Sequence, residues 1–280
     1  MRSVAELRAQ IEAYSALPTS ALPDEARAAF DDLREGLEAG TVRAAEPGPE
    51  GWRVNVWVKA GILLGFRLGV VVESEAAGPL YFLDKDTLPP RRFRLADRVR
   101  IVAGGSAVRA GAHLAPGVIV APPAWVNVGA FVGEGTMIDS HALVGSCAQV
   151  GSRVHLSAGA MLGGVLEPVG ALPVIVEDDV LVGGNCGVYE GTIVGARAVL
   201  GAGVILTGGV TVFDLIRKTQ YRKSGQQPLR IPDGAVVVPG SRRLLDPFAE
   251  RNGLSVAAPL IVKYRDEKTD AKAALEEALR

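Results

Sequence analysis

The chain has 280 residues, of which 48% are hydrophobic and 22% charged, and its 34 glycines and 17 prolines indicate a turn-rich globular protein. A net charge of −1 and a pI of about 6.3 offer no basic surface to nucleic acid. No apolar run reaches the roughly 18 residues of a membrane span and the N-terminus has no signal-peptide core, so we expect a cytoplasmic protein with neither nucleic-acid nor membrane partners.

Residues 1–98 are predicted to form an α-helical N-terminal domain. Val4, Leu7 and Ile11 are apolar residues at helical spacing and indicate a first helix, which ends before Pro18. A second helix is indicated in the same way by Ala26, Ala29, Phe30, Leu33 and Leu37. Asp24 near its start and Gly40 just past its end fit the residues that begin and end helices.

The remainder of this domain is less clearly patterned. The stretch WVKAGILLGFRLGVVV (57–72) is compatible with either a helix or a strand, and LPPRRF (88–93) indicates a turn or linker. The domain either caps the structure that follows it or contributes to substrate binding, and both interpretations are open at this point.

From residue 108 onward, every sixth residue is aliphatic. The first ten such positions are Val108, Leu114, Val120, Val126, Val132, Ile138, Val144, Val150, Leu156 and Leu162. After one step of 14 residues, seven more follow at Val176, Val182, Val188, Val194, Leu200, Leu206 and Val212. Seventeen hits in succession identify an internal repeat.

A six-residue unit fits a short strand followed by a bend, and three units close a triangular coil whose aliphatic residues point inward. Successive coils then pair as parallel strands about 4.8 Å apart. The sequence therefore predicts a mainly β protein in which residues 99–238 form a parallel β-helix of between five and six coils. The 14-residue step is either a two-residue bulge or an eight-residue loop.

Residues 239–280 are predicted to form a small C-terminal extension that covers the end of the coil. VAAPLIVKYR (256–265) is typical of a strand and TDAKAALEEALR (269–280) of a helix. The two cysteines, Cys147 and Cys186, have no metal-site spacing and are expected to be reduced, buried thiols.

Four motifs carry a resemblance to a known family. They are EGTMID (134–139), VGSCAQVG (144–151), VHLS (154–157) and GGVLEP (163–168). In this order they closely resemble the tetrahydrodipicolinate N-succinyltransferases of bacterial lysine biosynthesis, and residues 40–68 are similar to the helical N-terminal domain of that family. The resemblance implies a left-handed β-helix that acts as a homotrimer, although it does not say which face forms the interface.

The resemblance also implies an enzyme that moves a succinyl group from succinyl-CoA, its co-substrate, to the amine of ring-opened tetrahydrodipicolinate in the diaminopimelate branch of lysine biosynthesis. No metal is expected. This acyl transfer requires a proton acceptor for the amine, hydrogen-bond donors for the tetrahedral oxyanion, and cations for the carboxylates of the substrates.

Several substrate-binding residues follow from the same resemblance. Asp139 matches the aspartate that contacts the substrate amine, and it follows an inward residue, so its side chain is expected to project outward. Arg100 matches an arginine for a substrate carboxylate, although the segment after it is one residue longer here. Glu167 is expected to orient the substrate and Ser146 to line the pocket.

The proton acceptor is not fixed by the resemblance, because Gly187 stands where similar enzymes carry a glutamate proposed as the general base. Asp139, Glu190 and His141 remain as candidates, and we favour Asp139, with Glu190 as the second catalytic residue. His155 is expected to be structural. The basic residues expected to meet the phosphates of CoA are Arg217, Lys218, Arg222 and Lys223.

Three other functions remain open. The chain could transfer acetyl instead of succinyl groups to the same acceptor, although its length and the VGSCAQ run favour succinyl transfer. A zinc site like that of the γ-class carbonic anhydrases is disfavoured, because the spacings of His113, His141 and His155 are not multiples of an 18-residue coil. The third alternative is a non-catalytic β-helix scaffold.

Overall fold

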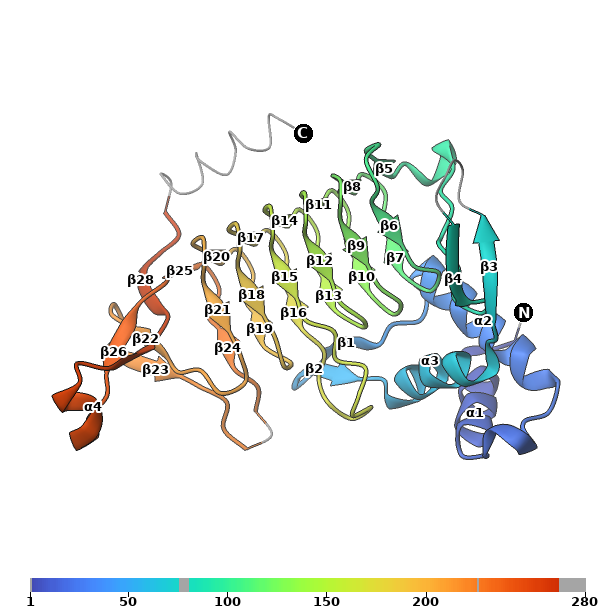
Figure 1. Ribbon diagram of the computed structural model, residues 1–280, viewed down its shortest axis with the longest axis horizontal. Coiled ribbons are helices and arrows are strands. Elements are labelled where there is room, and N and C mark those ends of the chain that lie inside the picture. Colours follow the sequence, from blue (N-terminus) through green and yellow to red (C-terminus); the bar gives the residue numbers. More distant parts are fainter. Residues whose placement is uncertain (1, 76–80, 226, 267–280) are drawn as a thin grey trace.

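The computed structural model describes residues 2–75, 81–225 and 227–266 of the chain. A three-sided prism of stacked coils forms the body, with the N-terminal helices packed beside one end and a group of hairpins at the other (Figure 1). The predicted parallel β-helix of hexapeptide repeats is therefore confirmed.

Each side of the prism is a parallel sheet of very short strands. The first face contains β5 (Arg100–Ile101), β8 (Ile119–Val120), β11 (Met137–Ile138), β14 (His155–Leu156), β17 (Leu181–Val182), β20 (Val199–Leu200) and β25 (Ala235–Val238). The second face contains β6 (Ala107–Val108), β9 (Trp125–Val126), β12 (Leu143–Val144), β15 (Met161–Leu162), β18 (Gly187–Val188) and β21 (Ile205–Leu206). The third face contains β7 (His113–Leu114), β10 (Phe131–Val132), β13 (Gln149–Val150), β16 (Ile175–Val176), β19 (Ile193–Val194) and β24 (Arg230–Ile231).

The repeat positions form the core of the prism. The second residue of most of these strands points inward and is fully or almost fully buried, and these side chains stack from coil to coil in one cluster. All seventeen predicted positions lie in this cluster. Val212 is buried there from β22 (Val212–Asp214), and Ile231 takes the next inward place on the third face.

The 14-residue step in the repeat is an eight-residue loop. β15 on the second face and β16 on the third face are consecutive strands of one coil, as β12 and β13 are in the coil before. The step thus contains the usual six residues plus eight, and a two-residue bulge is excluded. We call residues 163–172, which leave the corner between these faces, the insertion loop.

The N-terminal region contains three α-helices and two hairpins. Its elements are α1 (Val4–Ser15), η1 (Thr19–Ala21), α2 (Glu25–Ala39), β1 (Ala45–Gly48), β2 (Gly51–Val54), α3 (Val56–Leu68), β3 (Val71–Glu75), β4 (Tyr81–Lys85) and η2 (Leu95–Asp97). The two predicted helices are confirmed, and the stretch 57–72 is a helix that gives way to a strand after Gly69. Gly40 ends α2 in the left-handed conformation, with φ of 74°.

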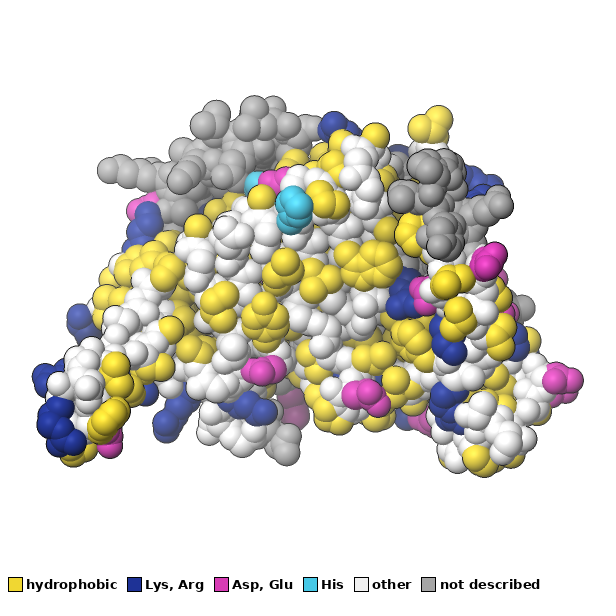
Figure 2. Space-filling model, in the orientation of Figure 1, with side chains coloured by type: hydrophobic (Ala, Val, Ile, Leu, Met, Phe, Trp, Pro, Cys, Tyr) yellow, Lys and Arg dark blue, Asp and Glu magenta, His cyan; other side chains and the backbone are white. Residues whose placement is uncertain are grey.

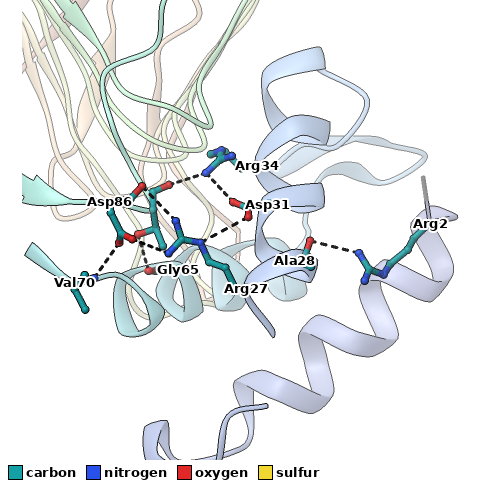
Figure 3. Close-up of polar contacts among 9 residues, drawn as sticks. Arg2, Arg27, Ala28, Asp31, Arg34, Gly65, Val70 and Asp86 are labelled. Atoms are coloured by element: carbon teal, nitrogen blue, oxygen red, sulfur yellow. Dashed lines mark hydrogen bonds and ion pairs between the residues drawn. The ribbon is translucent and has the colours of Figure 1, made fainter. Parts of the chain in front are cut away.

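Ion pairs hold α2 against the end of β4 (Figure 3). Arg27 donates to Asp86 at 2.9 Å, and Asp86 also accepts from the backbone N–H of Val70 at 3.0 Å. The bond from Arg27 is the main reason why the pKa of Asp86 lies below its usual value. Arg34 bridges Asp31 and the carbonyl of Thr87 in the same cluster.

The third face of the prism is covered by the N-terminal region of the same chain. Cys147, at a corner beside this face, is buried in the core formed by the three helices. The guanidinium of Arg43 lies 3.7 Å from the ring centroid of Phe131, and Trp52 packs with Ala45 over Ile175. Among the described residues, the outward side chains of Gln149, Ile175 and Ile193 on the third face are buried, whereas those of Trp125 and Ile205 on the second face are exposed.

Three of the C-terminal strands extend the sheet of the first face, and two others form a separate hairpin. The C-terminal elements are β22, β23 (Thr219–Tyr221), β26 (Ser241–Arg243), α4 (Pro247–Arg251), β27 (Ser255–Ala257) and β28 (Leu260–Tyr264). β28 pairs with β25 and β22 and so covers the end of the coil. The single strand predicted over 256–265 is in fact two strands that break at Pro259, and the helix predicted over 269–280 lies outside the described residues.

Candidate functional site

Asp139 stands at the end of β11, where the coil turns from the first face to the second. Its Oδ1 accepts a hydrogen bond from the backbone N–H of Ser140 at 2.7 Å, which orients the carboxylate outward. Its Oδ2 lies 3.7 Å from Nε2 of His155, which comes from the next coil. The side chain of Asp139 is 35% exposed and that of His155 is 15% exposed, so a solvent-accessible carboxylate is backed by a largely buried imidazole.

Arg100 lies on the same face. Its strand β5 is two strands from β11. Arg100 therefore lies about 10 Å along the prism axis from Met137, the residue of β11 that is two positions before Asp139. The step from Ile101 to Val108 spans seven residues, so the extra residue noted in the sequence is absorbed at this corner. Arg100, Asp139 and His155 form what we call the first-face group.

Four other predicted residues, Ser146, Glu167, Glu190 and Lys223, lie at the corner between the second and third faces. A cleft of about 1390 Å³ opens there between the β1–β2 hairpin, the insertion loop, the turn at residues 189–191 and the segment 223–230. Glu167, Glu190 and Lys223 line it. The carboxylate of Glu190 accepts a hydrogen bond from the backbone N–H of Gly208. Ser146 lies at the same corner, two coils before Glu190. Its carbonyl accepts a hydrogen bond from the backbone N–H of Val165, in the insertion loop, at 3.2 Å.

One wall of the cleft is a charged cluster around Glu177. Arg230 donates to both carboxylate oxygens of Glu177 at 2.8 Å, and the indole N–H of Trp52 donates to it at 3.0 Å. Burial alone would raise the pKa of Glu177, but the hydrogen bonds from Arg230 and Trp52 outweigh it and hold the pKa below its usual value. The cluster ties the β1–β2 hairpin to the coil.

We expect Glu177→Gln to lower the free energy of unfolding by about 1–2 kcal/mol at pH 7, because it weakens charge-assisted hydrogen bonds in a partly exposed cluster. Since the pKa of Glu177 is lower in the folded chain, this stabilisation is present above the usual glutamate pKa of about 4.3 and is lost as the pH falls through the lower native value. Urea unfolding of both proteins at pH 7 and near pH 3 measures it. A difference in stability that does not change with pH contradicts the assignment.

Gly187 is buried in β18, and its neighbourhood explains why no side chain stands there. A Cβ atom at Gly187 would lie 2.5 Å from Cε2 of Tyr189, so the ring of Tyr189 fills the space. Sequence reasoning missed Tyr189, because a lone aromatic residue at a coil corner has no period that reveals it. The useful signal is the glycine that precedes it by two residues in a strand.

The four basic residues predicted to contact CoA lie in different places. Lys223 lines the cleft, whereas Arg217 lies 4.0 Å from the ring centroid of Tyr264 near the end of the prism, and Lys218 occupies the turn between β22 and β23 with φ of 56°. Arg222 is exposed directly before Lys223. The structure thus brings one of the four predicted CoA contacts into the cleft.

The three histidines occupy separate places. His113 is on the third face, stacked on Phe131, with its Nδ1 2.9 Å from the carbonyl of Glu38. His155 is on the first face, and His141 is exposed in the turn after Asp139. This arrangement does not converge on one metal ion, which argues against the carbonic anhydrase alternative. Within the described ranges, every helix is too short or too polar to cross a bilayer.

A prism of stacked six-residue coils places the chain in the hexapeptide-repeat class of proteins. Residues 6–68 match the family described as tetrahydrodipicolinate N-succinyltransferase N-terminal, and residues 173–208 match the hexapeptide repeat of succinyl-transferase. The chain belongs to the tetrahydrodipicolinate N-succinyltransferase family, and this membership supports the left-handed sense expected for its β-helix.

Its relatives match along almost their whole length. The 2,3,4,5-tetrahydropyridine-2,6-dicarboxylate N-succinyltransferase of Granulibacter bethesdensis is 43% identical over 94% of this chain and 92% of its own. The enzyme of the same name from Gluconobacter oxydans is 42% identical over 99% of both chains, and that of Polynucleobacter asymbioticus is 42% identical over 94% of this chain and 92% of its own.

Proposed function

We propose that the protein transfers the succinyl group of succinyl-CoA to the amine of ring-opened tetrahydrodipicolinate, in the diaminopimelate branch of lysine biosynthesis. The near full-length likeness to N-succinyltransferases carries this assignment. The orientation of Asp139 supports it, since an outward carboxylate at a coil corner is placed to meet a substrate amine. We place the enzyme in the cytoplasm.

In this reaction the amine nitrogen attacks the thioester carbonyl. A C–N bond forms, the C–S bond breaks, and the amine proton passes to Asp139, from which it can reach the departing CoA thiolate. The bond from Ser140 N–H holds Asp139 in place, and the imidazole of His155 at 3.7 Å offers a second polar group beside it. Backbone N–H groups at the coil corners are candidates for the donors that stabilise the oxyanion.

We also propose that the active site is completed between copies in a homotrimer. The first-face group and the cleft lie at different corners of one chain, so a neighbouring copy is needed to bring such groups together. The third face is covered by the N-terminal region, which leaves the other two faces for this contact. The second face exposes apolar residues such as Trp125 (37%) and Ile205 (45%), and Figure 2 shows apolar side chains along the middle of the molecule.

CoA release from succinyl-CoA and from acetyl-CoA, with tetrahydrodipicolinate or L-2-aminopimelate as acceptor, tests the proposed function. Faster release from succinyl-CoA that depends on the acceptor supports it. A preference for acetyl-CoA would instead assign the sister activity, and no release with either donor would leave the scaffold alternative. The thiol assay needs a protein-only blank for Cys147 and Cys186, although both are buried.

A further inference from the structure

The ring of Tyr189 occupies space left by two glycines. Gly163 directly follows β15, and Gly187 is the first residue of β18, which pairs with β15 in the next coil. A Cβ atom on Gly163 would lie 2.6 Å from Cδ1 of Tyr189, and one on Gly187 would lie 2.5 Å from Cε2. Since real Cβ atoms are not found at such distances, glycine at both positions is what allows the ring to lie against the coil wall.

The hydroxyl of Tyr189 is available to a ligand. It is 2.9 Å from the place where a Cβ atom of Gly187 would stand, so it is held close to the wall of the prism. Tyr189 uses its backbone N–H and carbonyl in bonds with Leu206 and Thr192, but within the described part of the chain its hydroxyl makes no hydrogen bond.

The cleft around this hydroxyl is lined by cations as well as by the carboxylates of Glu50, Glu167, Glu177 and Glu190, and one of the cations is left for an anionic ligand. Tyr189 lines the 1390 Å³ cleft together with Lys223, whose ammonium makes no ion pair with any residue that the structure describes. Arg230, another cation of the cleft, is already bonded to Glu177 and Asp233. A hydroxyl donor and an ammonium in one cleft are a common combination for holding a carboxylate.

We propose that Tyr189 determines the acyl specificity of the enzyme by donating a hydrogen bond to the free carboxylate of a dicarboxylic acyl thioester. This rests on the proposed function, because succinyl-CoA has such a carboxylate and acetyl-CoA does not. A site that hydrogen-bonds a group of the correct substrate discriminates against analogues that lack it. Tyr189 is thus a specificity residue and takes no part in the proton transfer.

The test compares Tyr189→Phe, which keeps the ring and removes the hydroxyl, with the unaltered enzyme. We expect kcat/KM for succinyl-CoA to fall about 10-fold or more, chiefly through KM, while kcat/KM for acetyl-CoA stays within about twofold. Equal falls for both donors, or no change for succinyl-CoA, would overturn the proposal. Tyr14→Phe, a partly buried tyrosine of α1 in the helical region, is the control.

A second variant pair tests the role of the glycine. Gly187→Ala should displace the ring and cause the same selective loss, whereas Gly209→Ala, at an exposed turn outside the cleft lining where an added Cβ meets no atom within 4 Å, should not. Thermal-shift measurements of succinyl-CoA and acetyl-CoA binding test the role of Tyr189 independently of turnover, and so distinguish its failure from a failure of the proposed function. If the enzyme shows no turnover but Tyr189→Phe weakens succinyl-CoA binding selectively, the role of Tyr189 stands; if binding of both is unaltered, it is wrong.

Discussion

Asp139→Asn is expected to lower kcat/KM for succinyl transfer by about 10²–10⁴-fold, the usual contribution of a general base. The amide cannot take up the amine proton, but it keeps the size of the carboxylate and an oxygen that can accept the bond from Ser140 N–H. Since Asp139 projects from the coil, the melting temperature should change by no more than a few degrees. Steady-state kinetics across the pH range, with thermal unfolding of the same samples, measures both effects.

Asp178→Asn is the matched control for this experiment. Asp178 also lies at a coil corner and accepts a hydrogen bond from a backbone N–H, that of Ser152 at 2.8 Å, but it is not part of the first-face group or the cleft lining. Its replacement should leave turnover within about twofold. Near-normal turnover of Asp139→Asn with an unchanged pH profile would show that another group, Glu190 or His141, accepts the proton.

His155 gives a finer readout of the same site. Its Nε2 lies 3.7 Å from Oδ2 of Asp139, which is longer than a good hydrogen bond, so His155 acts as a positioning residue rather than as the base. His155→Gln should therefore cost less turnover than Asp139→Asn and should shift the pH profile. A loss equal to that of Asp139→Asn would instead place His155 in the proton transfer.

Most of the prism could be predicted, because its core depends on one repeating requirement. Each coil needs an aliphatic residue at the middle of each side, and a sequence period of six reports this directly. The period marks which residues point inward but not the face on which they lie. For this reason the step of 14 residues fitted two geometries, and the period could not tell that Ile231, rather than Val212, follows Val194 on the third face.

The site was less accessible to sequence reasoning. Asp139 could be placed as an outward residue from its position after Ile138, and the 18-residue coil also puts His155 over Met137, but the approach of Nε2 to Oδ2 at 3.7 Å required the structure. The same holds for Tyr189 over Gly163, which lies 26 residues earlier. Contacts between coils depend on the length of every corner between them, and one insertion alters the pairing.

The role of the N-terminal region also required the structure. The sequence left open whether this region caps the coil or contributes to substrate binding. The structure shows that it covers the third face and that its β1–β2 hairpin forms one wall of the cleft. A lysine from α3 connects the region to the insertion loop, and its replacement is the second large effect that we expect.

Lys59 is completely buried in α3, and its ammonium donates to two carbonyls of the insertion loop, Ala171 at 2.8 Å and Pro168 at 3.3 Å. Lys59→Met keeps the length of the side chain and removes the donor. The loop that holds Glu167 should then lose its anchor, so we expect kcat/KM to fall about 10-fold or more, and amide exchange in residues 163–172 to accelerate. Lys85→Met, which removes a similar bond to the carbonyl of Gly69 away from the cleft, should do neither.

The pH dependence of stability separates anchoring from a general loss of packing. Burial lowers the pKa of Lys59, while the nearby Cys147 opposes this shift. Between the lowered native pKa and the usual lysine pKa of about 10.4, the unfolded chain binds more protons than the folded one, so stability due to Lys59 rises with pH in that window. The free energy of unfolding should therefore increase more with pH in the unaltered protein than in Lys59→Met. Parallel curves for the two proteins would mean that Lys59 is not held as a buried ammonium, and the loop would then need another anchor.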